Sequence, residues 1–268
     1  MRVAVVQQSP RRDVVSTTAH QVELIRSAAT RGARLIVLPE AGLTGFALRH
    51  DEALAGAQPL DGAYVAELGA LSASLGIAIV TNIYVPARVE GRAVVYNTSV
   101  LIEQGALVRT YRKIHLFDAQ SFCESAFVEG GDAAQVLEPP TSIEGIAVSL
   151  ATCFDLRFAE LAVTLARRGA DLIAVPAAWV AGTNKLTQWD TLLRARAIET
   201  GCFVAGAAQP GPTYCGGSAV YGPEGEPAGP TMGRDEEGTT AADVDHAAVV
   251  RARATTPTLR HRPVWDAR

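Results

Sequence analysis

Short runs of β-branched residues alternate with longer helical patterns along most of this chain, and each helical pattern stops at a glycine. The predicted strands are residues 3–7, 35–38, 77–84, 94–101, 148–151, 172–175, 203–207 and 217–221. The predicted helices are residues 13–31, 62–75, 158–168 and 185–200. This alternation is typical of helices packed against a β-sheet, so it predicts an α/β fold.

Residues 77–107 interrupt this pattern because they contain two strands joined by a bend at Pro86 and Gly91, and a further strand-like run at residues 111–114 follows Gly105. A short connection of this kind joins antiparallel strands, so the sheets should be mixed rather than all parallel. No segment reads as a linker between two domains. We therefore expect a single domain over residues 1–268, with the tail at 251–268 docked on the domain or on a partner subunit.

The composition predicts a folded domain and narrows the range of partners. Of the 268 residues, 48% are hydrophobic and 19% are charged, a balance that can bury a large core and excludes a disordered chain. The net charge of −4, without any block of Lys or Arg, argues against nucleic acid or an anionic membrane as a partner. No apolar run reaches the ~18 residues of a membrane span. The N-terminus resembles a strand rather than a signal peptide, so we expect a cytoplasmic protein.

Four cysteines, Cys123, Cys153, Cys202 and Cys215, stand too far apart for a zinc cluster. No two of them are separated by two residues, and no histidine lies at ligand spacing from any of them. We therefore expect no structural metal. In a reducing compartment the ordinary state of each cysteine is a buried, inert thiol.

Three predicted strands end in side chains that suit catalysis. Glu40 follows an apolar strand, Lys113 lies among apolar residues and would need an anionic partner if buried, and Cys153 ends a strand that turns into a helix. Binding sites of α/β sheets form at the carboxyl ends of strands. A helix start after Cys153 would stabilise a thiolate and aim the backbone N–H of Phe154 at a developing oxyanion. Alone, each residue also fits an ordinary role: a solvated loop acid, a surface lysine or an inert core thiol.

Together and in this order, the three segments resemble the signature blocks of the nitrilase, or carbon–nitrogen hydrolase, superfamily. The matching stretches are Leu-Pro-Glu at 38–40, Tyr-Arg-Lys-Ile-His-Leu-Phe-Asp at 111–118 and Cys-Phe-Asp-Leu-Arg-Phe at 153–158. The resemblance implies the family's α-β-β-α sandwich of two mixed β-sheets flanked by helices. It also implies a catalytic triad of Glu40, Lys113 and Cys153, with no metal and no organic cofactor.

The family also places a second glutamate soon after the lysine, and Glu124 in Phe-Cys-Glu-Ser at 122–125 matches that block. Glu124 follows Lys113 more closely than in many relatives, which leaves Glu129 as an alternative. In the implied reaction Glu40 takes the proton from Cys153, and Lys113 and the Phe154 N–H hold the oxyanion.

The blocks look most like the omega-amidase and deaminated glutathione amidase branch, whose substrates are small amides that bear a carboxylate. The resemblance thus implies an amidase that forms a thioester and releases an acid and ammonia. Arg157 lies about one helical turn beyond Cys153 and can grip the carboxylate, or it can pair with Glu160 or Asp155. Trp179 can form a pocket wall or belong to the core.

Two alternatives remain open at this point. The same residues can serve an N-carbamoyl amidohydrolase or a nitrilase, because all three reactions pass through a thioester-type intermediate. A catalytically silent scaffold is disfavoured, because such a protein has no physical reason to keep a costly Lys and carboxylate cluster. We expect a small-molecule amide as the substrate, and a homodimer or larger even homo-oligomer as the assembly.

Overall fold

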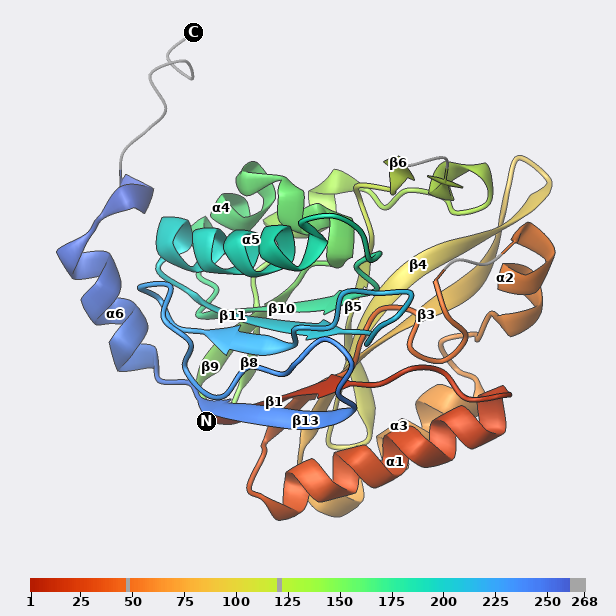
Figure 1. Cartoon of the computed structure of the whole chain (residues 1–268), viewed down its shortest axis with the longest axis horizontal. Helices are drawn as coiled ribbons and strands as arrows, with labels where there is room; N and C mark the ends of the chain where they lie inside the picture. Colours follow the sequence, from red (N-terminus) through yellow and green to blue (C-terminus); the bar gives the residue numbers. More distant parts are fainter. Residues whose placement is uncertain (47–48, 120–121, 261–268) are drawn as a thin grey trace, which may run out of the picture.

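Two β-sheets lie face to face between layers of helices in the computed structural model, which describes residues 1–46, 49–119 and 122–260 (Figure 1). The first sheet contains, in this order, β13 (Gly238–Asp243), β1 (Arg2–Gln7), β2 (Leu35–Val37), β3 (Ala78–Val89), β4 (Arg92–Glu103) and β5 (Ala106–Arg112). The second contains β12 (Ala219–Tyr221), β11 (Phe203–Ala208), β10 (Leu172–Ala177), β9 (Ile146–Leu150) and β8 (Thr141–Ile143). A separate two-stranded ribbon is formed by β6 (Asp118–Ala119) and β7 (Phe122–Cys123).

Both sheets are mixed, as the bend in residues 77–107 predicted. In the first sheet β1, β2 and β3 are parallel, whereas β13, β4 and β5 run antiparallel to their neighbours. In the second, β9, β10 and β11 are parallel and β8 and β12 are antiparallel. The parallel strands of each sheet therefore end at a common edge, which is where the catalytic candidates are expected.

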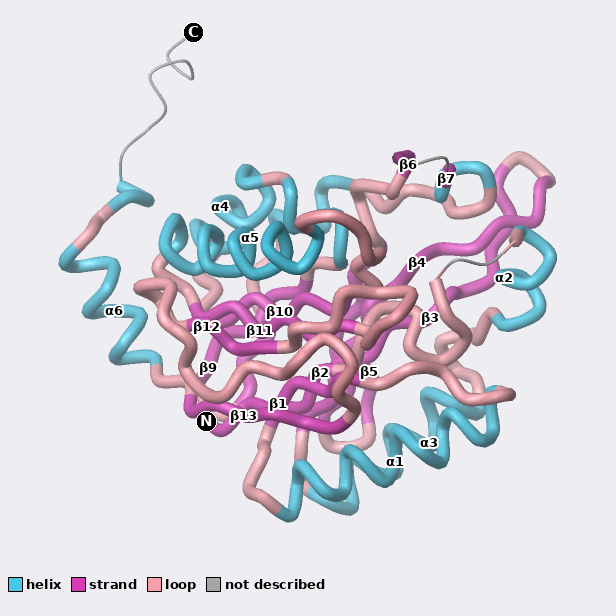
Figure 2. Tube along the Cα trace, in the orientation of Figure 1, coloured by secondary structure: helices cyan, strands magenta, loops and turns pink. Residues whose placement is uncertain are grey.

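Helices cover the outer face of each sheet, which confirms the α-β-β-α sandwich. The first sheet is covered by α1 (Val14–Thr30) and α3 (Ala63–Leu75), and the second by α4 (Ala159–Arg167) and α5 (Lys185–Thr200) (Figures 1 and 2). The short helix α2 (His50–Gly56) lies beside β3 and β4. None of the helices among the described residues is long and apolar enough to cross a bilayer.

The alternation of side chains along β1 shows how the layers are held together. Val3 and Val5 are buried in the cluster that fills the space between the two sheets, whereas Ala4 and Val6 belong to the cluster under α1 and α3. Successive side chains of a strand point to opposite faces, so one apolar strand serves two cores. This is why the predicted strands are almost continuously hydrophobic.

The helices begin and end at the capping residues that the sequence predicted. Asp13 caps α1 by accepting a hydrogen bond from the Ser16 N–H at 2.8 Å, and the chain leaves the helix through Gly32 at a φ of +86°. The stops of α3 at Gly76 and of α5 at Gly201 are left-handed glycines as well.

Besides the short strands β6, β7 and β8, the elements that were not predicted include α2, β13 and the C-terminal helix α6 (His246–Thr255). The tail expected from residue 251 therefore begins inside a helix. Since only Val249 of α6 is buried, the helix carries no apolar stripe that a sequence pattern could reveal. The strand β13 is rich in small residues and is held by its pairing with β1 rather than by its own hydrophobicity.

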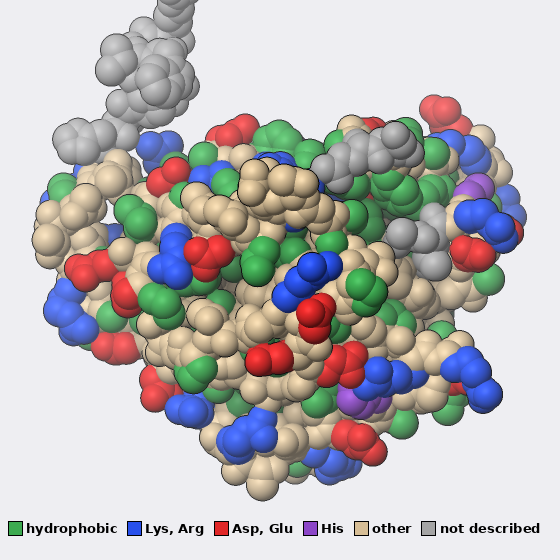
Figure 3. Space-filling view, viewed as in Figure 1, with side chains coloured by type: hydrophobic (Ala, Val, Ile, Leu, Met, Phe, Trp, Pro, Cys, Tyr) green, Lys and Arg blue, Asp and Glu red, His purple; other side chains and the backbone are tan. Residues whose placement is uncertain are grey.

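The surface carries both signs of charge without separating them. On the face drawn in Figure 3, acidic and basic side chains are interspersed and no broad region of a single sign is visible. This fits the small net charge of −4.

Candidate active site

The three predicted strand ends meet at one edge of the sandwich. Glu40 follows β2, Lys113 is the first residue after β5, and Cys153 lies just beyond β9 in the opposite sheet. The Nζ atom of Lys113 donates to Oε1 of Glu40 at 2.8 Å and to Oε2 of Glu124 at 2.9 Å. The side chains of all three charged residues have no solvent exposure. Lys113 thus has the buried anionic partners that its apolar surroundings required.

The carboxylate of Glu40 faces both halves of the molecule. Its Oε1 accepts from Lys113 and from Nδ2 of Asn97, at 2.8 Å in each case. Its Oε2 accepts from the backbone N–H of Ala178 at 2.8 Å, next to β10 of the second sheet. The same carboxylate lies beside Cys153, where burial and then the charge of Glu40 raise the pKa of the thiol. Glu40 is therefore in reach of the nucleophile's proton, as a general base must be.

Cys153 lies on a sharp turn with a strained backbone. Its φ is +45°, in the left-handed region that a non-glycine residue rarely adopts, and it begins a short 3₁₀ helix over Cys153–Arg157. Thr152 N–H donates to the buried Asp155 carboxylate at 3.0 Å, and Tyr111 donates its hydroxyl to the same carboxylate at 2.7 Å. These hydrogen bonds to the buried Asp155 carboxylate hold the turn in place, which keeps the sulfur of Cys153 directed into the pocket.

The expectation of a thiolate stabilised by a helix dipole is wrong. Burial, followed by the negative charge of Glu40, raises the pKa of Cys153 well above its ordinary value of 9.0, although Lys113 opposes the shift. The regular helix α4 begins only at Ala159, so a turn of 3₁₀ helix separates it from the sulfur. The site thus combines a thiol of raised pKa with a carboxylate beside it that can accept the thiol proton.

The second glutamate is Glu124, and Glu129 lies elsewhere. Glu124 accepts from Lys113 and, at 2.6 Å, from the backbone N–H of Phe117, whereas Glu129 is partly exposed and faces Arg92 at 3.9 Å. Burial raises the pKa of Glu124, and the ammonium of Lys113 opposes this shift. Burial would by itself lower the pKa of Lys113, but Glu124 and then Glu40 outweigh it and raise that pKa well above 10.5.

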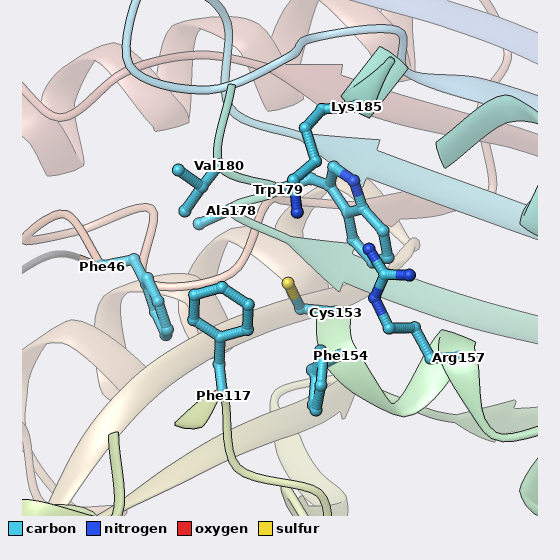
Figure 4. A pocket seen from close by; sticks show the side chains of 9 residues that line it. All are labelled: Phe46, Phe117, Cys153, Phe154, Arg157, Ala178, Trp179, Val180 and Lys185. Carbon is cyan, nitrogen blue, oxygen red and sulfur yellow. The ribbon is translucent and has the colours of Figure 1, made fainter. Parts of the chain in front are cut away.

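A pocket lined mainly by apolar and aromatic side chains opens over the sulfur of Cys153 (Figure 4). Its lining residues are Phe46, Phe117, Cys153, Phe154, Arg157, Ala178, Trp179, Val180 and Lys185. All three residues predicted to bind substrate, Phe154, Arg157 and Trp179, are among them. Arg157 stacks over the Trp179 ring at 4.7 Å and donates to Gln188 at 2.8 Å, rather than pairing with Glu160 or Asp155.

Several residues of the site were not predicted from the sequence, among them Lys185, Phe46 and Asn97. Lys185 begins α5 and points into the pocket from the side opposite Phe154 (Figure 4). Within the described part of the chain, neither Lys185 nor Arg157 has a carboxylate partner. The sequence does single out Lys185 in one respect: the chain has only two lysines, and the other one is Lys113.

The described residues contain no group of three His, Cys, Asp or Glu side chains placed to hold a metal ion. Charge in the site comes from the buried ammonium, the two carboxylates and the cations of the pocket. Such an arrangement can move a proton from a thiol and stabilise negative charge on a substrate oxygen.

Comparison with known proteins gives the family. The carbon–nitrogen hydrolase model matches residues 2–254. Deaminated glutathione amidase of Escherichia coli O157:H7 is 36% identical over 241 residues, which are 89% of this chain and 88% of that protein. The resemblance inferred from the strand-end blocks, including its deaminated glutathione amidase branch, is therefore confirmed.

Solved structures show the same fold. A CN-hydrolase superfamily protein from Xanthomonas campestris, solved with an arsenic adduct in its active site, aligns with a TM-score of 0.83 at 29% identity, covering 98% of this chain and 97% of that one. A variant amidase from Nesterenkonia sp. AN1, which shows the result of Michael addition of acrylamide at its active site cysteine, aligns with a TM-score of 0.76 at 28% identity, covering 95% and 97%. The chain therefore belongs to the carbon–nitrogen hydrolase family and is a hydrolase of carbon–nitrogen bonds other than peptide bonds.

Proposed function

We propose that this protein is an amidase that hydrolyses a small carboxylate-bearing amide to an acid and ammonia, with Cys153 as the nucleophile. The observation that carries the proposal is the position of its thiol, which lies beside the Glu40 carboxylate and opens into a pocket with two cations that lack carboxylate partners among the described residues. The amidases among the compared proteins support the same reaction.

In the first half of the reaction, Glu40 takes the thiol proton as the sulfur of Cys153 attacks the amide carbon. Lys113 and the backbone N–H of Phe154 stabilise the oxyanion, a contribution typically worth ~10²–10³ in rate per donor. The protonated Glu40 then gives its proton to the amide nitrogen. The carbon–nitrogen bond breaks, ammonia leaves, and the acyl group remains on sulfur as a thioester.

In the second half, Glu40 takes a proton from water, and the resulting hydroxide attacks the thioester carbon. The carbon–sulfur bond breaks, the thiol regains its proton, and the carboxylic acid is released. Glu124 holds Lys113 in position throughout and takes no proton from the substrate. We place this reaction in the cytoplasm, in a homodimer or larger even homo-oligomer.

The substrate class follows from the pocket. Aromatic walls exclude water, while Arg157 and Lys185 are two positive charges in a partly desolvated space. Burial lowers the pKa of Lys185, and the charge of Arg157 lowers it further. A carboxylate on the substrate removes this repulsion and forms charge-assisted hydrogen bonds, so acidic amides bind better than neutral ones.

The test is ammonia release from a panel of α-ketoglutaramate and its homologues, N-carbamoyl amino acids and simple nitriles. We expect the ω-amides of carboxylic acids to give the highest kcat/KM, and a mass shift equal to the acyl group on Cys153 during turnover. Cys153→Ala should abolish both. A preference for N-carbamoyl amino acids or nitriles would show that the substrate is not a carboxylate-bearing amide. Turnover by Cys153→Ala would show that Cys153 is not the nucleophile.

A further inference from the structure

We infer that Asn97 is a positioning residue that holds the two catalytic carboxylates in their reactive arrangement through its side-chain amide. One Nδ2 group donates both to Oε1 of Glu40 at 2.8 Å and to Oε1 of Glu124 at 2.9 Å. The backbone carbonyl of Asn97 accepts from the N–H of Lys113 at 2.8 Å. Asn97 therefore contacts all three members of the buried charge cluster.

The orientation of this amide is dictated by a chain of hydrogen bonds that starts at the backbone. The N–H of Ala41 can only donate, and its partner at 2.8 Å is Oδ1 of Asn82. The opposite end of Asn82, Nδ2, then faces Oδ1 of Asn97 at 2.8 Å. This leaves Nδ2 of Asn97 for the carboxylates. No rotation of either amide preserves these contacts.

The same chain continues to the nucleophile. Nδ2 of Asn82 also donates to Oγ of Ser99 at 3.1 Å, and the Ser99 hydroxyl shares a hydrogen bond with the Thr152 hydroxyl at 2.9 Å. Thr152 directly precedes Cys153, and Ala41 directly follows Glu40. We call this chain of hydrogen bonds the relay; its side chains are those of Asn97, Asn82, Ser99 and Thr152. The relay links the base of the first sheet to the nucleophile of the second, and each of its side chains is at most 1% exposed.

The electrostatic reason for an amide at this position is the imbalance of charge. Two carboxylates share one ammonium, which leaves an excess negative charge in a space without solvent. The two hydrogens of Nδ2 stabilise both anions without carrying a proton that could be lost. The Nδ2 group of Asn97 also occupies Oε1 of Glu40. The other carboxylate oxygen, Oε2, faces the second sheet, where it accepts from the Ala178 N–H.

The titratable groups around this pair are few. Lys113 from the end of β5, Tyr84 from β3 and Cys153 from the second sheet face the carboxylates, and Arg157 faces the sulfur from the pocket. Removal of the Asn97 N–H groups leaves Lys113 and the backbone N–H groups of Ala178 and Phe117 to stabilise the anions. The carboxylates should then hold protons at higher pH, and Glu40 should lose its ability to accept the thiol proton there.

The experiment is alkylation of Cys153 by iodoacetamide as a function of pH, quantified by peptide mass spectrometry with the exposed Cys123 as an internal reference for intrinsic thiol reactivity. In Asn97→Leu we expect the acid-side midpoint to move up by about one pH unit and the plateau rate to fall about tenfold. Thr98→Val alters a buried neighbour on β4 whose hydroxyl donates to the Tyr96 carbonyl at 3.3 Å, and it should change neither the midpoint nor the plateau rate. An unchanged midpoint in folded Asn97→Leu would overturn the inference.

A second variant tests the orientation without altering a group that touches the carboxylates. Asn82→Asp places an acceptor against Oδ1 of Asn97, so the Asn97 amide must turn its oxygen toward Glu40 and Glu124. We expect the same upward shift of the midpoint, and no shift would contradict the relay even if Asn97→Leu fails to fold.

The inference rests on Glu40 as the base of the proposed function, and Glu40→Gln separates the two. That variant should lose the acid-side titration and react only at alkaline pH. If it keeps the wild-type profile, the proposed mechanism fails. If it behaves as expected while Asn97→Leu and Asn82→Asp keep the wild-type midpoint, the positioning inference alone fails.

Discussion

At the scale of single residues, the cost of this site lies in burying three charges that do not cancel. A buried ion pair is weakly stabilising at best, and removing one partner leaves an uncompensated charge that costs roughly 3–5 kcal/mol. The cluster of Lys113, Glu40 and Glu124 is therefore kept for its chemistry. It places one carboxylate, that of Glu40, next to a thiol whose proton the carboxylate can accept.

The first prediction concerns the pH dependence of kcat/KM. Because the pKa of Glu124 is raised above 4.5, its carboxylate, and with it the full pair with Lys113, forms only as the pH rises through that higher value. Activity should therefore appear on the acid side at a midpoint above 4.5. Because the pKa of Lys113 is raised above 10.5 and that of Cys153 above 9.0, no alkaline loss should occur below pH 9.

The control for this profile is Glu124→Gln, which cannot titrate. It should remain folded with lower activity, and its acid-side midpoint should differ from that of the wild type. A wild-type midpoint at or below 4.5, or a loss of activity between pH 7 and 9, would contradict the assigned protonation states.

The second prediction concerns substrate charge. Lys185→Met should raise KM about tenfold or more for a carboxylate-bearing amide, because one charge-assisted hydrogen bond is lost, and should leave KM for a neutral amide of equal length nearly unchanged. Steady-state kinetics on the two substrates measures the effect. Arg168→Met, an exposed cation that follows α4, is the matched control and should alter neither. Equal losses on both substrates would show that Lys185 serves the fold rather than recognition.

The sequence predicts the residues of the site that belong to local motifs and misses those that do not. Glu40, Lys113 and Cys153 each end a recognisable strand, and their blocks occur in a known order. Asn97 lies inside a strand and acquires its partners from positions 57 and 27 residues away. No local pattern encodes such a contact, because it exists only once the strands have paired and the loop with Glu124 has closed over them.

At the scale of elements, the same distinction holds. The strands that form both cores were predicted because apolar, β-branched runs mark them, and four helices because a glycine ends each of them. The helix α6 was missed because polar side chains such as Arg253, rather than an apolar stripe, attach it to the domain. Arg253 donates to the carbonyls of Thr200 and Ala170 at 3.1 and 2.6 Å and lies 2.9 Å from the sulfur of Cys202.

The third prediction tests this attachment. Arg253→Ala should lower the free energy of unfolding by about 2 kcal/mol, since two buried carbonyls lose a charged donor, and should expose Cys202 to thiol reagents. Chemical denaturation and peptide mass spectrometry measure the two effects. Arg251→Ala, on the same helix, removes only a surface pair with Asp245 at 3.8 Å and should cost far less. Similar losses in both variants would mean that Arg253 does not anchor α6.

At the scale of the whole molecule, the site depends on how the two sheets are placed. The base, the ammonium and Asn97 belong to the first sheet and its loops, whereas the nucleophile and the Ala178 N–H belong to the second. The sequence pattern predicts the strands of both sheets but neither their division into two sheets nor the relative placement of these sheets, because side chains from many segments fill the space between them. Only the resemblance to a known family supplied that placement in advance.

The last prediction concerns assembly. Two large apolar side chains on neighbouring helices are exposed: Ile198 on α5 at 53% and Val250 on α6 at 52%. Burying such side chains at an interface stabilises association by roughly 1.5 kcal/mol or more each. If the proposed homodimer uses this helical face, Ile198→Asp combined with Val250→Asp should shift the protein to a slower-sedimenting monomer in analytical ultracentrifugation. Val15→Asp, which alters an 80% exposed valine on α1 in the other helix layer, should sediment like the wild type. A double variant that sediments like the wild type would exclude this face as the interface.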